Sequence, residues 1–133
     1  MVRVPFLRIR RAGRRQPERG ASSLEFVGML PLLLLVAMAG IQLGLAGYAV
    51  QQAGTGARAA ARLAGQQDTA DGYAAGGRAA MSGWTAQRST FALSGGGDEV
   101  TVKTTVTIPS VIPGFGSLGT ASRSATMPAD EDD

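Results

Sequence analysis

The residue types that most often carry enzymatic chemistry are scarce in this sequence. It contains no histidine and no cysteine, which removes the commonest general base, the commonest metal ligand and every thiolate nucleophile. The carboxylates between the long apolar run and the acidic tail occur in predicted turns and links and form no recognisable pair. They are Asp68, Asp71, Asp98 and Glu99. We therefore expect no enzymatic activity, no metal site and no cofactor.

Glu25 is the carboxylate whose position suggests a role. It stands at the edge of a run without any charged residue, which ends only at Arg58, and a carboxylate beside a membrane-spanning segment is costly. If the chain were cut after Gly20, the new amino group on Ala21 would lie one helical turn before Glu25. Glu25 can pair with that amine or with the amine of an adjacent subunit. Alternatively, it is an interfacial side chain that reaches water at the edge of the membrane.

The run from Phe26 to Val50 is long enough to cross a membrane as one helix. Its 25 residues carry no charge, and Gln42 and Tyr48 are its only polar side chains, whereas about 20 apolar residues span a bilayer. Residues 1–20 hold seven arginines and one glutamate, while the rest of the chain holds six basic and nine acidic residues. By the positive-inside rule, the N-terminus is cytoplasmic and the C-terminal part extracytoplasmic.

The helical pattern continues beyond the predicted membrane segment of about 26–50. Alanines dominate "AGTGARAAARLAG", in which Gly54 and Gly56 weaken the helix and Gly65 ends it. A helix over 21–64 would be roughly 66 Å long. Because less than half of that length lies in the membrane, we expect the C-terminal half of the helix to be exposed on the extracytoplasmic side.

Three glycines recur on one side of this helix and predict a helix-association face. Gly40 and Gly44 form a G-x-x-x-G pair, and Gly47 continues the same side. Since the chain has 19 glycines, chance spacing is the alternative. Gln42 lies between them, where it would either bond to a neighbouring helix or sit unpaired near the bilayer midplane.

Residues 65–133 are predicted to form a small exported domain, which makes the whole chain α+β. A shorter helix is expected over about 69–86. Alternating valine and threonine over 99–108 predicts a strand, "GGGD" before it predicts a turn, and an acidic tail ends the chain. Weaker strands are expected at 88–94 and 120–127, with a loop over 109–119. Because 69 residues without a disulfide rarely build a sufficient core, this domain must pack on the long helix or on neighbouring subunits.

The segment around Glu25 has a recognisable order of residues. A basic leader ends at Gly20, small residues follow from Ala21, and Glu25 and Phe26 come directly before the apolar run. This order resembles the class III signal of type IV pilins, in which a prepilin peptidase cuts after glycine and the fifth mature residue is glutamate. Together with "LPLLLL" and "GARAAARLAG" downstream, residues 18–65 resemble the TadE-like family of pseudopilins.

This resemblance implies roles for individual residues. Gly20 and Ala21 would flank the cleaved bond, so that residues 1–20 are the leader. Glu25 and Phe26 would be the fifth and sixth residues of the mature chain, and Pro31 would kink the helix.

The resemblance also implies a function, which is structural. The chain would be a minor pilin or pseudopilin of a tight-adherence (Flp-type, type IVc) pilus, in the cytoplasmic membrane or in the extracellular pilus. Its implied partners are a prepilin peptidase, other pilins or pseudopilins, pilus assembly membrane proteins and membrane lipid, in an oligomeric assembly.

Other interpretations of the N-terminal region predict a different mature protein. "AMA" at 37–39 resembles a signal-peptidase site, and cutting there would release 40–133 as a small secreted binding domain. An uncleaved chain would instead be a plain membrane-anchored domain. "RIRRAGRR" lacks the pattern that follows a twin-arginine signal, and the apolar run is longer than a secretory core of about 7–15 residues. Nucleic-acid binding is not expected, because the arginines precede an apolar segment rather than forming a folded basic face.

Overall fold

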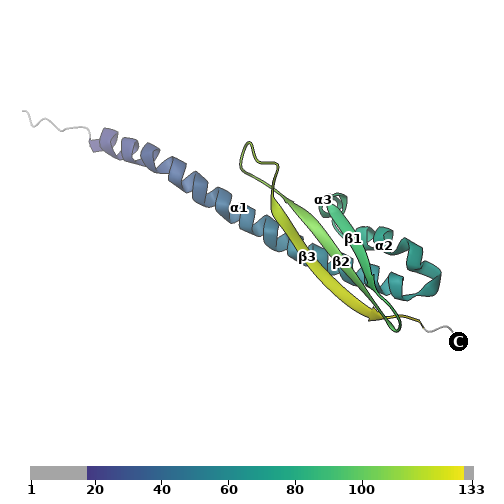
Figure 1. Cartoon of the computed structure of the whole chain (residues 1–133). Coiled ribbons are helices and arrows are strands. Elements are labelled where there is room, and N and C mark those ends of the chain that lie inside the picture. The colour runs from purple at the N-terminus through teal and green to yellow at the C-terminus, as the bar shows by residue number, and fades with distance from the viewer. Residues whose placement is uncertain (1–17, 131–133) are drawn as a thin grey trace, which may run out of the picture. The chain divides into compact units, whose positions relative to one another are not determined.

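The computed structural model describes residues 18–130 of the chain, with the side chains of 18, 19 and 67–69 left out. Two compact units divide the chain, residues 1–35 and residues 36–133. In the first unit, the described residues form the beginning of helix α1. All other elements belong to the second unit (Figure 1). Most of the predicted leader lies outside the described residues.

Helices come first along the chain and strands follow. The helices are α1 (Glu18–Gly65), the 3₁₀ helix η1 (Gln67–Gly72), α2 (Tyr73–Ala79) and α3 (Gly83–Gln87), and the strands are β1 (Ser89–Gly95), β2 (Glu99–Pro109) and β3 (Ser117–Pro128). The predicted α+β class is confirmed. All three predicted strands are present, with bounds within three residues of those expected.

The sheet is antiparallel in the order β1-β2-β3. Ser89 pairs with Val106 at one end of the first ladder, and Val106 also pairs with Ala121 of β3. The β1–β2 hairpin closes through the predicted glycine turn, in which Gly95 has φ +115° and Gly97 has φ +75°. Glycine suits both positions because other residues rarely adopt a positive φ.

The exposed C-terminal half of the predicted helix is the surface on which the sheet packs. Six of the eleven buried apolar residues among those described belong to α1, and all six are alanines. Their small side chains let the strands approach the helix closely. They are Ala49, Ala53, Ala57, Ala60, Ala61 and Ala64. The expectation that the small domain depends on the long helix is therefore confirmed within the second unit.

The inward face of β2 follows the predicted alternation. Val102, Val106 and Ile108 are buried and face the two apolar clusters that contain the α1 alanines. Thr104 occupies the same face and is also fully buried. Its Oγ1 atom has no hydrogen-bond partner, so a polar atom lies in an otherwise apolar layer.

The prediction of one helix over about 69–86 is wrong. The segment instead forms η1, α2 and α3, with a break between Ala79 and Gly83. Ser82 has extended backbone angles (φ −67°, ψ 152°) at the start of α3, so the helical period is interrupted there. Gly77 and Met81 are nevertheless buried.

Candidate processing and assembly site

The bond between Gly20 and Ala21 lies in the first turns of α1. The helix begins at Glu18, and both residues are exposed. No atom lies within 4 Å of the position that a Gly20 Cβ would occupy. Packing within the chain therefore does not explain a glycine at this position.

Glu25 follows Ala21 by one turn of α1 and is exposed, as is its neighbour Phe26. Leu24 is 75% and Phe26 61% exposed, so Glu25 lies between two large apolar residues that are mostly exposed. Because α1 begins at Glu18, Glu25 lies two turns into the helix, beyond the exposed amide groups of the first turn. The position suits an interaction with a positive group outside the described part of the chain.

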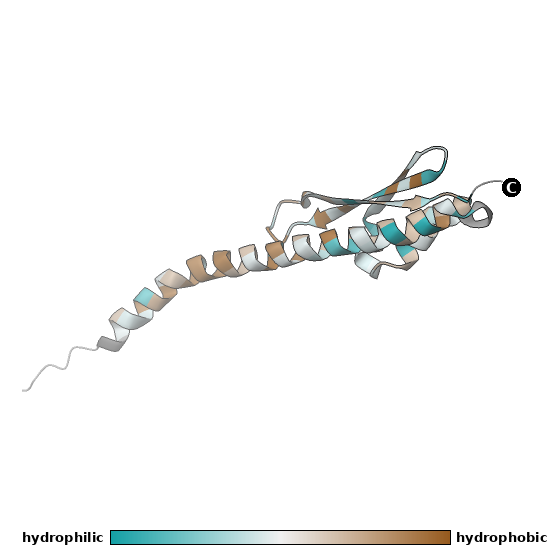
Figure 2. Ribbon diagram, turned by 90° about the horizontal axis from the view of Figure 1, so that it is seen from below, coloured by the Kyte–Doolittle hydropathy of each residue, from teal (hydrophilic) through white to brown (hydrophobic). Residues whose placement is uncertain are grey.

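Pro31 lies inside α1, and the helix continues through it. Proline has no N–H to donate to the carbonyl four residues earlier, here that of Val27, and its ring crowds that carbonyl. The predicted kink at Pro31 remains a prediction. The apolar side chains around it are exposed, among them Leu32, Leu33, Leu34, Leu35 and Val36, and Figure 2 shows this part of α1 as its most continuous hydrophobic stretch.

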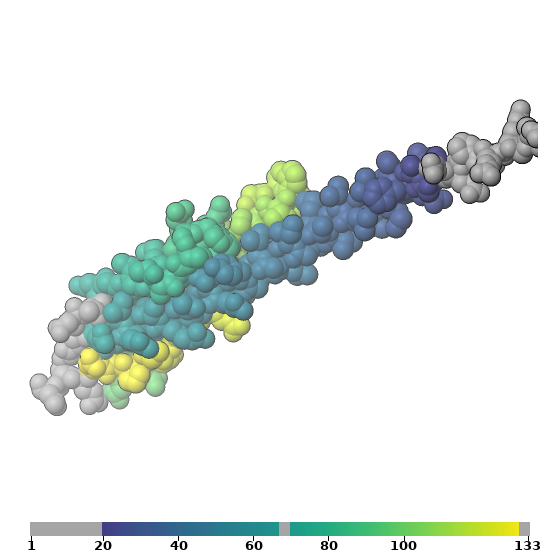
Figure 3. Space-filling view, turned by 180° about the vertical axis from the view of Figure 1, so that it is seen from behind, coloured from purple at the N-terminus to yellow at the C-terminus, as the bar shows by residue number. Residues whose placement is uncertain are grey.

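Gly40, Gly44 and Gly47 are exposed on α1. A Cβ at any of them would meet nothing within 4 Å, so these glycines do not make room for the sheet. Gly56 differs, because a Cβ there would lie 2.5 Å from the Met81 sulfur. Gly56, which the sequence suggested as a weak point of the helix, is thus a close-approach position. In Figure 3 the face of α1 that points away from the sheet is uncovered.

The sequence suggested that Gln42 either bonds to a neighbouring helix or sits unpaired, but in the structure it bonds to the segment that follows β2. Its Nε2 donates to the Pro109 carbonyl oxygen at 3.1 Å, and its Oε1 accepts from the Val111 N–H at 3.0 Å. One side chain of α1 therefore holds two backbone groups at the end of β2, the Pro109 carbonyl and the Val111 N–H. Together with the fully buried Ala49, this contact shows that the C-terminal part of the predicted 26–50 span packs within the second unit.

A second glutamine of α1, Gln52, has a similar role that the sequence did not reveal. Its Oε1 accepts from the Ser82 N–H at 2.9 Å, and the buried Thr85 hydroxyl lies 3.5 Å from the same oxygen. The Thr85 hydroxyl also donates to the Ser82 carbonyl at 2.9 Å. Gln52 thus secures the N-terminus of α3. Its partners lie about 30 residues away, and no local pattern identifies them.

The comparison with protein families agrees with this geometry. Residues 20–62 match the family model of TadE-like proteins. The match begins at the residue before the predicted cut and ends within the alanine-rich part of α1, so the predicted resemblance is confirmed over this segment. It suggests a Tad pilus-associated protein. No curated protein and no solved structure matches the chain.

One helix in the described part of the chain is long and apolar enough to cross a membrane. That segment, Gly20–Gly65, lies near the N-terminus and contains an apolar stretch with no buried residue. It is a candidate for a single membrane span by length and composition.

A groove between α1 and β3 holds two arginines. It has a volume of about 320 Å³ and is lined by Val50, Gln51, Gly54, Arg58, Arg123 and Ser124. Both arginines are exposed, and each lies 3.8 Å from the position of a Gly54 Cβ. The atoms near that position are the Arg58 Nη2 and the Arg123 Cγ. A groove lined by two basic side chains suits a carboxylate of another molecule. Only the fold brings Arg58 and Arg123 to the same groove.

The described residues contain no group of three or more histidine, cysteine, aspartate or glutamate side chains that could hold a metal ion. The expectation of no enzymatic activity stays a prediction. The features of the described residues that a function can use are exposed helix surfaces and a basic groove, together with the predicted processing motif.

Proposed function

We propose that this chain is a TadE-like minor pilin or pseudopilin of a tight-adherence (type IVc) pilus, processed by a prepilin peptidase after Gly20. The observation that carries the proposal is the family match over residues 20–62, which starts at the predicted cleavage site. Within it, Ala21, Glu25 and Phe26 keep the spacing of the pilin signal at the start of a long apolar helix.

The apolar N-terminal part of α1 anchors the mature protein in the cytoplasmic membrane. Since the packed unit already includes Gln42 and Ala49, the span corresponds to residues 21–41 rather than 26–50. As a helix this segment rises roughly 30 Å, which is the thickness of the hydrocarbon core. The arginine-rich leader stays in the cytoplasm, and the sheet lies on the opposite side of the membrane.

Glu25 serves assembly in this proposal. Cleavage creates an ammonium group on Ala21, and the Glu25 carboxylate neutralises either that amine or the amine of an adjacent subunit. Such pairing is favourable because an isolated ammonium or carboxylate group is costly in an apolar environment, whereas the two groups together neutralise each other. The exposed Gly40, Gly44 and Gly47 offer a surface on which a second helix can approach closely.

The partners are the prepilin peptidase, other pilins or pseudopilins and the membrane proteins of the assembly system. The basic groove at Arg58 and Arg123 is a second surface for a subunit that presents a carboxylate. No reaction is assigned to the chain itself.

The decisive experiment is intact-mass measurement of the protein purified from the membrane of cells that contain the pilus system. We expect a mature N-terminus at Ala21. A chain that starts at Gly40 would indicate ordinary secretion, and a chain that retains Met1 would indicate a plain anchor.

Replacing the residue before the cut gives a matched test of the peptidase. Gly20→Leu should leave the unprocessed chain in the membrane, because the peptidase site requires glycine, whereas the control Ser22→Ala should be processed. Loss of the leader from Gly20→Leu at the normal rate would contradict prepilin processing.

A further inference from the structure

The loop between β2 and β3 exposes large apolar side chains. Ile112 is 41%, Phe115 63% and Leu118 45% exposed, and we refer to these three residues as the loop patch. No charged residue occurs from Thr104 to Ser122. Exposed large apolar side chains gathered on one loop mark a candidate interaction surface.

The loop is ordered locally rather than loosely attached. The Phe115 N–H donates to the Ile112 carbonyl at 3.3 Å, and the Ile112 N–H donates to the Ser110 hydroxyl at 3.0 Å. Gln42 holds the beginning of the loop at Pro109 and Val111. The loop patch is therefore presented at a fixed place along α1.

That place is where the packed domain gives way to the exposed apolar helix. The neighbours of Gln42 on α1 are Ile41, which is 57% exposed, and Leu43, which is 74% exposed. Both belong to the charge-free run that precedes Arg58. The loop patch and these two side chains form apolar surface at the same level of the helix.

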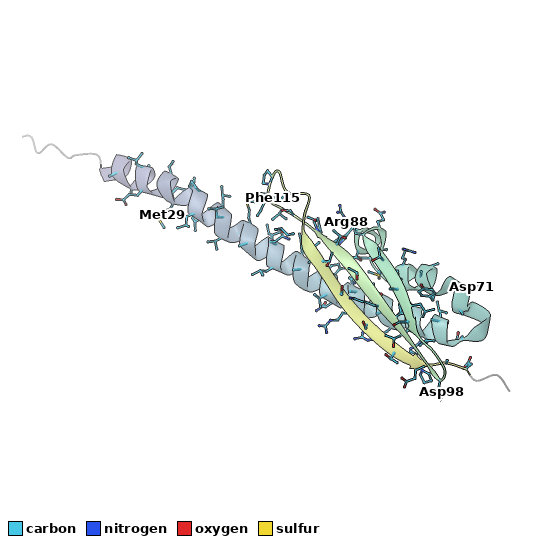
Figure 4. All side chains as sticks on the ribbon, in the orientation of Figure 1. Met29, Asp71, Arg88, Asp98 and Phe115 are labelled. Atoms are coloured by element: carbon cyan, nitrogen blue, oxygen red, sulfur yellow. The ribbon has the colours of Figure 1, made fainter. Side chains whose placement is uncertain are left out.

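The charged end of the domain lies at the opposite end of the sheet. Figure 4 shows Phe115 at one end of the strands and Asp98 at the other. Glu99 and Lys103 belong to the half of β2 that is remote from the loop. In Figure 3, the loop residues form a projection beside α1. On β2, charge is thus confined to the half remote from the loop, whereas Arg88, whose carbonyl accepts from the Thr107 N–H, lies near the loop end of the sheet.

We propose that the loop patch inserts into the headgroup region of the membrane, on the side where α1 emerges. This inference rests on the proposed membrane span of α1. A phenylalanine flanked by aliphatic residues is favourable at that depth, and no charge has to leave water. The loop amides and carbonyls stay hydrated there, which the hydrocarbon core would not permit. Lipid is favoured over a second copy of the chain because the loop patch lies at the level of the exposed Ile41 and Leu43 of the same unit, where the proposed span ends.

The experiment uses the absence of native cysteine. Single-cysteine variants of the full chain, Leu33→Cys, Phe115→Cys and Ser94→Cys, carry an environment-sensitive fluorophore and are reconstituted at high dilution in phosphatidylcholine–phosphatidylglycerol vesicles. Spin-labelled lipids quench the fluorophore either near the headgroups or deep in the bilayer. Leu33 reports on the span, Phe115 on the loop patch, and Ser94 on the charged end.

We expect strong deep quenching at Leu33, at least threefold stronger shallow than deep quenching at Phe115, and no quenching by either lipid at Ser94. Adding Gln42→Leu should reduce shallow quenching at Phe115 at least twofold without changing the signal at Leu33. If Leu33 is quenched and Phe115 behaves like Ser94, the loop patch does not touch lipid and the inference fails.

Two other results separate the alternatives. A Phe115 fluorophore that is shielded from water but not quenched by lipid would overturn the inference in favour of contact with a second copy. Absence of quenching at Leu33 would instead refute the membrane span, and with it the proposed function.

Discussion

Thr104 carries a buried hydroxyl group that has no hydrogen-bond partner. It is fully buried between Val102 and Val106 on β2. Burial of an unpaired hydroxyl costs free energy because the water that it loses is not replaced. The alternating pattern placed an inward side chain at this position but did not reveal that it lacks a partner.

Thr104→Val should therefore raise the free energy of unfolding by about 1 kcal/mol. The control is Thr101→Val on the opposite face of the strand, where the hydroxyl lies 2.7 Å from that of Thr126; this variant should be neutral or slightly destabilised. Thermal unfolding in detergent micelles gives both values. A lower unfolding temperature for Thr104→Val would show that the hydroxyl has a stabilising partner.

Glu25 is the residue on which assembly depends in our proposal. Glu25→Ala should still be cleaved, since the bond is at Gly20, but should recover at least tenfold less partner pilin in co-purification, because an ammonium group is left without its carboxylate. Glu25→Asp keeps the charge and should retain most of the partner. Equal recovery with all three chains would argue against pairing.

At the scale of elements, α1 acts as the scaffold of the second unit. Its alanine face packs under the sheet, Gln42 holds the β2–β3 loop, and Gln52 holds the start of α3. The aromatic pair of Tyr48 and Trp84, with ring centroids 5.8 Å apart, adds a further contact to α3. One helix thus organises each of the segments that follow it.

Ala53→Leu should destabilise this unit by about 1–3 kcal/mol, because extra methyl groups in a close-packed layer force the strands away. Ala53 is fully buried in the cluster with Met81 and Val106. Thr55→Leu changes an exposed position of the same helix and should cost less than about 0.5 kcal/mol. Equal unfolding midpoints for the two variants in denaturant titration would contradict close packing at Ala53.

At the scale of the whole molecule, the sheet cannot form its core without the helix. The second unit begins at Val36, so the helix contributes its C-terminal half to the same unit as the strands. Residues 66–133 alone would lose six of the eleven buried apolar side chains. The predicted domain boundary at residue 65 is a boundary between elements, whereas the compact unit crosses it.

A chain of residues 36–133 should fold, whereas residues 66–133 should not. Circular dichroism and the dispersion of amide proton resonances measure the difference, with the longer chain as the control. Removing α1 exposes Val102, Val106 and the buried Thr85 to water. Cooperative thermal unfolding of 66–133 would refute the dependence on α1.

The sequence by itself determined the features that depend on local order. The alternation of valine and threonine predicts β2, and the charge-free run predicts a long helix. The spacing from Gly20 to Phe26 indicates the family, because a processing signal is a linear feature that requires no folded partner. The glycine-rich turn between β1 and β2 was likewise predicted from the sequence, since the requirement for a positive φ is local.

Only the tertiary structure decided which residues of the long helix pack within the domain. Gln42 looks like a polar residue inside a membrane segment, but its two partners lie more than 60 residues further along the chain. The hydrogen bonds of Gln52, and the groove that Arg58 and Arg123 share, likewise depend on segments that are distant in the sequence. Hydropathy depends on each residue type and its near neighbours, whereas burial and hydrogen bonding depend on which remote segments the fold brings into contact.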